Sequence, residues 1–182
     1  MNICGKCEAP VSTWQRLSRH EHVIGGARVE LMDSALEVSC EKCGERAVII
    51  PNLLGLIAAV AIDRAQTPIK LNGREIRFLR KTLEMAAKDL ADMLEVSAET
   101  VSRWECDRQP ISANNERIFR MKIVVGLSDR APAMEPRLDE LMTMKLSPIR
   151  NEFDLSVSRF ALVRFKKDGK KHDQWDTELL AA

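Results

Sequence analysis

The chain has 182 residues, of which 45% are hydrophobic and 30% are charged, and its formal net charge is +1. This length allows two small domains, and the near-zero net charge means that a nucleic-acid interface would need a local basic face. Only 4% of the residues are aromatic and there is no Tyr, which disfavours a large aromatic-rich β-sandwich and favours helices.

No targeting or membrane-spanning segment is predicted. The first residues lack a basic stretch followed by an apolar run. The longest apolar run, 53–62, is too short to span a bilayer. We therefore expect a cytoplasmic protein without a membrane partner, in a compartment where thiols stay reduced.

Residues 1–50 predict a small β module. Strand-like runs are predicted at 11–17, 22–24 and 28–32. Gly25 and Gly26, between the second and third runs, are typical of a hairpin turn. Residues 36–39 lead from this hairpin into a pair of cysteines.

Two CxxC pairs bracket this β module, and their four cysteines are Cys4, Cys7, Cys40 and Cys43. Two residues between cysteines let both sulfurs reach one ion from a tight turn, and two such pairs supply the tetrahedral sulfur set that Zn²⁺ prefers. Gly44 suits the turn after the second pair. We predict one structural Zn²⁺ per chain, with no open position for water and hence no hydrolytic chemistry.

Alternatives to zinc remain at this point. An iron–sulfur cluster uses the same ligands. A redox CxxC would stand at a helix N-terminus within an α/β pattern, which residues 1–50 lack. His20 and His22 would share one face of a strand, but without a carboxylate partner they are interpreted as surface histidines.

Residues from 51 onward predict helices. Asn52 can cap a helix over 53–64 that is apolar nearly all round and so is expected to be buried between domains or in a dimer seam. Residues 65–68 predict a linker. Further helices are predicted at 74–84, 87–94, 98–105, 113–125 and 137–146. Their expected inward side chains are Ile76, Leu79, Leu83, Leu90, Leu94, Val101, Trp104, Ile118, Met121 and Val125.

The end of the chain predicts a β-hairpin. Strand-like runs at 159–165 and 173–175 flank Asp168 and Gly169, a hairpin-turn dipeptide. The basic turn is interpreted as a solvated loop rather than a phosphate-binding arm; its lysines are Lys166, Lys167, Lys170 and Lys171.

The predicted fold class is α+β, with four parts along the chain. A zinc-ribbon-like β module (1–50) is followed by a connecting helix and linker (51–68). An all-α helix-turn-helix domain (69–126) and a C-terminal helix with a short hairpin (127–182) complete the chain.

The helix predicted at 98–105 is the candidate recognition helix. Ser97 can cap it, and Val101 with Trp104 would point inward, while small Ala91 would let the preceding helix approach closely. The opposite face would enter the major groove of DNA. The candidate DNA-binding residues are Ala98, Glu99, Ser102, Arg103, Lys88 and Arg108.

The run 100–105, followed by Arg108 and Pro110, resembles the recognition helix of the Xre/Cro-type helix-turn-helix family. Together with the N-terminal CxxC pairs, this layout resembles the MqsA-type antitoxins, which are zinc-finger plus helix-turn-helix regulators. The resemblance implies a repressor that dimerises through its C-terminal domain, binds a palindrome and can bind a toxin through the zinc module. It places Arg103 at a base-reading position and Glu99 where that antitoxin has Asn.

The chain departs from the family pattern at three places. Glu95 and Asp107 stand where the wider family carries Gly, and a left-handed backbone there would cost a non-glycine residue about 1 kcal/mol. Ala87 replaces a Gln that touches DNA in many relatives. Cys106, the fifth cysteine, is interpreted as an inert thiol rather than a redox switch.

The sequence therefore predicts a sequence-specific DNA-binding repressor that binds double-stranded DNA as a homodimer, either as the autoregulating antitoxin of a toxin–antitoxin pair or as a stand-alone regulator. The alternative is a protein-binding adaptor that uses the zinc module. An enzyme is not expected, because the chain has no Gly-rich phosphate loop, nucleophile elbow or HExxH motif.

Overall fold

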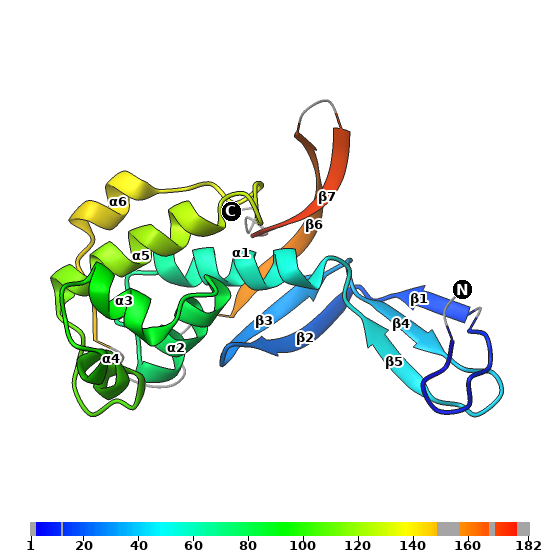
Figure 1. The fold of residues 1–182 in the computed structure, drawn as a ribbon. Helices are drawn as coiled ribbons and strands as arrows, with labels where there is room; N and C mark the ends of the chain where they lie inside the picture. The colour runs from blue at the N-terminus through cyan, green and yellow to red at the C-terminus, as the bar shows by residue number, and fades with distance from the viewer. Residues whose placement is uncertain (1–2, 12, 149–156, 168–169, 178–182) are drawn as a thin grey trace.

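The computed structural model describes residues 3–11, 13–148, 157–167 and 170–177. These residues form a mixed α+β fold, as expected, and it contains two sheets and six helices (Figure 1). The elements in chain order are β1 (Thr13–Arg16), β2 (Arg19–Ile24), β3 (Ala27–Met32), β4 (Leu36–Ser39), β5 (Arg46–Ile49), α1 (Leu53–Gln66), α2 (Gly73–Thr82), α3 (Ala87–Met93), α4 (Ala98–Glu105), α5 (Ala113–Leu127), α6 (Leu138–Thr143), β6 (Ser158–Lys167) and β7 (Lys170–Thr177). The helices gather at one end of the molecule and the three-stranded sheet stands at the other (Figure 1).

The three-stranded sheet has the antiparallel order β1-β4-β5. In its register Trp14 lies opposite Val38, which lies opposite Ala47, so these side chains share one face. β5 was not predicted, because its sequence does not alternate polar and apolar residues. All four of its residues are exposed in the structure. The turn between β4 and β5 carries the second cysteine pair, and the segment that precedes β1 carries the first.

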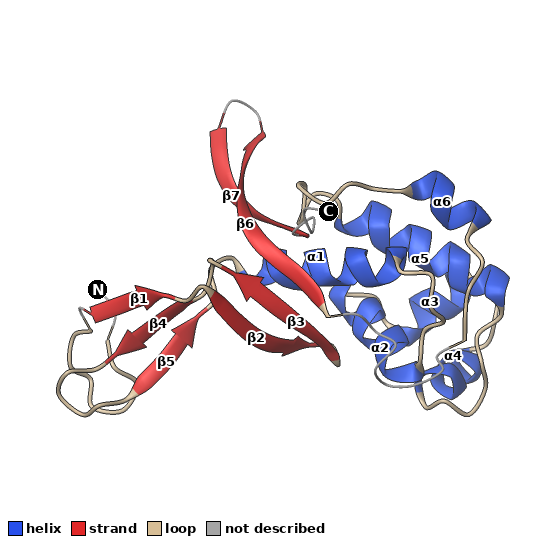
Figure 2. Cartoon of the chain, turned by 180° about the vertical axis from the view of Figure 1, so that it is seen from behind, coloured by secondary structure: helices blue, strands red, loops and turns tan. Residues whose placement is uncertain are grey.

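The four-stranded sheet has the order β2-β3-β6-β7 and joins the two ends of the chain (Figure 2). The predicted hairpin turn at Gly25 and Gly26 is confirmed, and both residues have positive φ. β3 then pairs in parallel with β6, with Leu31 opposite Phe160. The predicted C-terminal hairpin therefore forms as β6 and β7, but as half of this sheet and not as a separate tail. Its turn at 168–169 and its four lysine side chains lie outside the described residues.

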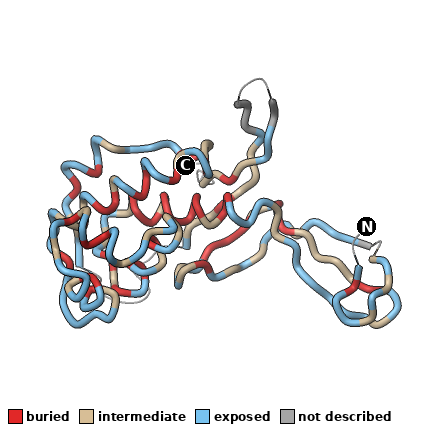
Figure 3. The backbone as a smooth tube through the Cα atoms, viewed as in Figure 1, coloured by how far each residue is buried: buried red, intermediate tan, exposed pale blue. Residues whose placement is uncertain are grey.

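α1 is the central helix and is buried along most of its length, as predicted (Figure 3). Asn52 caps it by accepting a hydrogen bond from the Gly55 N–H at 3.2 Å. Trp175 on β7 donates from its indole N–H to the carbonyl of Pro51 at 3.0 Å. The predicted linker 65–68 is wrong in its first half, because the helix continues to Gln66.

α5 buries the face opposite to the one expected. Ile118 is 42% exposed and Val125 is 57% exposed, and Met121 is only half-buried. The buried residues of α5 are Glu116, Phe119, Arg120, Ile123, Val124 and Leu127. Hydrophobic periodicity missed this face because two of its members are charged.

The two charged residues of that face belong to a buried network. Arg120 pairs with Glu116 at 2.7 Å and donates to the carbonyls of Ala65 at 2.8 Å and Thr67 at 2.6 Å. Arg64 pairs with Glu75 and donates to the carbonyl of Lys70 at 2.9 Å. The arginines satisfy carbonyls at the end of α1 and in the connector to α2, so their burial holds that connector in one conformation.

Candidate metal centre and candidate nucleic-acid interface

The two cysteine pairs lie in knuckles that share one backbone pattern. In the first knuckle, the Glu8 N–H donates to the Cys4 carbonyl at 3.0 Å. In the second, the Gly44 N–H donates to the Cys40 carbonyl at 2.8 Å. Gly44 has a φ of 71°, as its place after the second pair predicts, and Glu8 adopts a φ of 58° without being glycine. Each knuckle therefore turns its two thiols to the same side.

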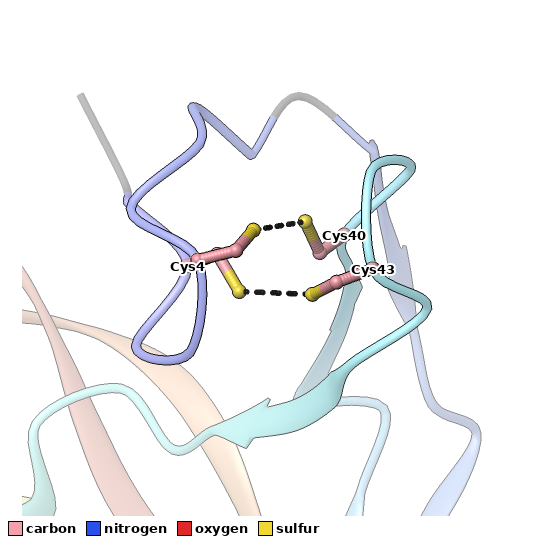
Figure 4. A group of neighbouring side chains, drawn as sticks. Cys4, Cys40 and Cys43 are labelled. Atoms are coloured by element: carbon pink, nitrogen blue, oxygen red, sulfur yellow. Dashed lines mark hydrogen bonds between the residues drawn. The ribbon is translucent and has the colours of Figure 1, made fainter.

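The four sulfurs converge on one point (Figure 4). The Sγ atoms of Cys4 and Cys43 are 3.5 Å apart, as are those of Cys7 and Cys40, and all four lie within 4.8 Å of one another. A tetrahedral ion with bonds of about 2.3 Å requires sulfurs about 3.8 Å apart. The group is thus compatible with a single structural metal site. Within the described residues, no other cluster of three or more His, Cys, Asp or Glu side chains could hold a metal ion.

Without a cation, the four cysteines cannot all be thiolates at once. Backbone N–H groups of Lys6 and Cys7 lower the pKa of the Cys4 thiol to about 6. For Cys43, the backbone N–H of Glu45 favours the thiolate, but the neighbouring thiols and burial outweigh it and raise the pKa to about 12. A divalent cation bound between the sulfurs would supply the compensating charge that four thiolates need.

The histidines stand apart from this cluster. His20 and His22 project from the same face of β2, as expected, and their rings stack at 5.8 Å between centroids. Both are half-buried and neither belongs to the group of metal-ligand geometry. They are not ligands of the four-cysteine site.

α3 and α4 form the second candidate site. Ser97 caps α4 by accepting a hydrogen bond from the Thr100 N–H at 3.1 Å. α4 spans the predicted residues and buries Val101 and Trp104, as predicted. The candidate DNA-binding residues are all exposed; they are Lys88, Ala98, Glu99, Ser102, Arg103 and Arg108. The lone thiol of Cys106 is also exposed, at the end of α4.

α4 is held in place by α2. The Arg80 guanidinium bonds both carboxylate oxygens of Glu105, at 2.6 and 3.2 Å. A Cβ atom at Gly73 would come within 2.5 Å of the Trp104 carbonyl, so the start of α2 packs directly on the backbone of α4. These contacts fix the exposed face of α4 relative to the core.

Three consecutive helices end in the same motif. α2, α3 and α4 are each followed by a left-handed residue at C′: Glu84, Glu95 and Asp107, with φ of 58°, 54° and 55°. In each case the next N–H bonds the carbonyl five residues back, as from Val96 to Ala91 at 2.9 Å, which is the Schellman pattern. The left-handed turns therefore form at Glu95 and Asp107 without glycine, despite the cost that the sequence suggested.

The exposed residues of 87–108 carry charges of both signs. The cations are Lys88, Arg103 and Arg108, and the acidic residues are Asp89, Asp92, Glu95, Glu99 and Asp107. Glu99 Oε1 and Arg103 Nη2 are 2.6 Å apart, with side chains that are 71% and 52% exposed. Their spacing of four residues along a helix predicts such a pair.

Comparisons with protein-family models, curated proteins and solved structures find no match for this chain. None of the described helices combines the length and the hydropathy that crossing a bilayer requires.

Proposed function

We propose that this chain is a sequence-specific DNA-binding transcriptional repressor with one structural zinc ion in its four-cysteine site. The observation that carries the proposal is α4, which buries Val101 and Trp104 and presents its other face to solvent. α3, a four-residue turn and α4 together fit a helix-turn-helix, in which the second helix enters the major groove. The motif within α4, with its resemblance to Xre/Cro-type recognition helices, supports the same reading.

Arg103 is the proposed base-reading residue. Arg offers two parallel donors to O6 and N7 of guanine, the commonest specific contact in the major groove. Ala98 and Ser102 are small and exposed, so the helix can approach the base edges closely. Lys88 and Arg108 would contact phosphates. The exposed charges of 87–108 are not predominantly basic, in contrast to the local basic face that the near-zero net charge would call for. We therefore expect few phosphate contacts and a shallow dependence of affinity on salt, with a slope of about −0.9 for each phosphate contacted.

A homodimer on a palindromic operator completes this proposal. The solvent-facing side of α5 carries Ile118, Met121 and Val125, so this helix is apolar on two opposite faces. A helix of this kind packs on both sides. A twofold axis through this stripe would pair two recognition helices, which matches the symmetry of an inverted-repeat site.

A protein partner for the metal module is the second candidate function. One face of the β1-β4-β5 sheet combines Trp14, which is 68% exposed, with Val38, Ala47 and Ile49. Exposed apolar patches mark protein interfaces, and Trp is enriched at their energetic centres. This face would bind the toxin if the chain is an antitoxin, and another protein if it acts as an adaptor; a stand-alone regulator would lack such a partner.

Selection of binding sites from a random DNA pool tests the main proposal. We expect wild type to select an inverted repeat and Arg103→Ala to lose about 1–3 kcal/mol at one base pair of each half-site. Arg46→Ala, which removes an exposed arginine of β5, is the matched control and should leave the consensus unchanged. Failure of the wild-type protein to enrich any sequence, or an unchanged consensus for Arg103→Ala, would reject α4 as the reading helix.

A further inference from the structure

A groove lies where the first turn of α1 meets the second half of α2. Its volume is about 700 Å³, within the range of small-molecule sites, about 300–1,000 Å³. It is lined by Asn52, Leu54, Gly55, Ile57, Phe78, Lys81, Thr82, Glu84 and Arg130. It lies outside both candidate sites described above and takes no part in the proposed reading of DNA.

The walls of the groove are apolar. Leu54 is 77% exposed although it belongs to α1, whose other apolar residues are mostly buried. Ile57 and Phe78 are half-buried beside it. The Phe78 ring also packs against the β2–β3 turn, where a Cβ at Gly25 would come within 2.2 Å of the ring. The aromatic wall is therefore held in place from behind.

The rim of the groove carries a net positive charge. Arg130 is already engaged, since it donates to the Thr82 carbonyl at 3.0 Å and to Glu84 at 2.8 Å. The ammonium of Lys81 has no hydrogen-bond or ion-pair partner among the described residues. The groove thus pairs an exposed apolar wall with one uncompensated cation.

We propose that this groove binds an amphipathic anion, a small molecule with an aliphatic body and one carboxylate. The body would lie against Leu54, Ile57 and Phe78, and the carboxylate would pair with Lys81. Such a ligand is favoured because it removes apolar surface from water and neutralises the free charge at the same time. A ligand bound there would contact both the central helix α1 and the helix α2.

The test is a titration of the full-length, zinc-loaded, ¹⁵N-labelled protein with decanoate below its micellar concentration, followed by amide chemical shifts. We expect saturable shifts confined to 52–57, 78–84 and 130. Lys81→Met keeps the apolar stem but removes the charge, and should weaken binding about tenfold, the equivalent of one charge-assisted hydrogen bond. Decanol, which lacks the charge, should bind wild type as weakly as decanoate binds Lys81→Met.

Leu54→Asp provides the second variant. The position is exposed and lies in the first turn of a helix, where an acidic side chain is favourable, so the variant should fold normally and lose decanoate binding. Lys122→Met on α5 and Met142→Asp on α6 are matched controls at exposed positions outside the groove and should bind as wild type does. Undiminished binding by Leu54→Asp, equal affinity for decanol and decanoate, or shifts elsewhere would each overturn the proposal. All these outcomes are independent of whether the protein binds DNA.

Discussion

The left-handed residues that end α2, α3 and α4 should respond differently to replacement by glycine. An L-residue in this conformation costs about 1–2 kcal/mol relative to glycine, and glycine returns about 0.5–1 kcal/mol of that through the entropy of the unfolded chain. Glu95→Gly should therefore raise the free energy of unfolding by about 0.5–1 kcal/mol. Among the described residues the Glu95 side chain has no hydrogen-bond or ion-pair partner that this change would remove.

Asp107→Gly should have the opposite sign. Asp tolerates the left-handed region better than Glu, so less strain is relieved. Asp107 Oδ1 also accepts a hydrogen bond from the Gly73 N–H at 2.6 Å, which ties the end of α4 to the start of α2. A hydrogen bond to a charged group contributes about 1.5–3 kcal/mol, and partial exposure reduces this value, so we expect a net loss of about 1 kcal/mol.

Urea unfolding of the zinc-loaded protein, followed by the helical circular dichroism signal, measures both effects. Glu84→Gly is a third member of the series and should be nearly neutral, since relief of strain is offset by loss of its ion pair with Arg130, which is exposed. Equal shifts for Glu95→Gly and Asp107→Gly would refute the reasoning, because both positions have the same backbone conformation and differ in the side-chain contact.

Cys40→Ser should abolish metal binding and unfold only the β1-β4-β5 sheet, because ligation is the main source of order there; one zinc per chain by elemental analysis is expected for wild type, and iron or no metal would contradict it. Val125→Asp should convert the proposed dimer to a monomer by light scattering, whereas Val23→Asp, at an exposed site on β2, should not; a wild-type monomer, both free and with DNA, would exclude the stripe on α5. Burial raises the pKa of Asp63, so protonation favours the folded state, and Asp63→Asn should stabilise the protein at neutral pH while still accepting a hydrogen bond from Ser158. That gain should vanish as the pH falls below the ordinary pKa of Asp, and a gain that persists in acid would contradict the assignment.

Structural features that depend on a few neighbouring residues were predicted correctly from the sequence alone. Asn52 and Ser97 were expected as helix caps, and each accepts a hydrogen bond from the N–H three residues on. The spacing of Val101 and Trp104 predicted the buried face of α4, and the CxxC spacing predicted two knuckles. Caps, helical faces and tight turns depend on neighbours within about one turn of chain, so the local sequence contains the information that determines them.

The tertiary structure decided what distant segments do to one another. Strand β6 pairs with β3 although Phe160 and Leu31 are far apart in the sequence. No local pattern in either strand indicates which strand it will pair with. α5 has apolar residues on two faces, and the face that carries Arg120 is the buried one. Arg120 can be buried there because it donates hydrogen bonds to carbonyls at the end of α1. The convergence of the four sulfurs and the groove beside Leu54 also arise from contacts between segments that are far apart in the sequence. Pairing, choice of face and cavities depend on which surfaces meet once the chain has collapsed, and that choice is set by the summed contacts of the whole fold rather than by any local pattern.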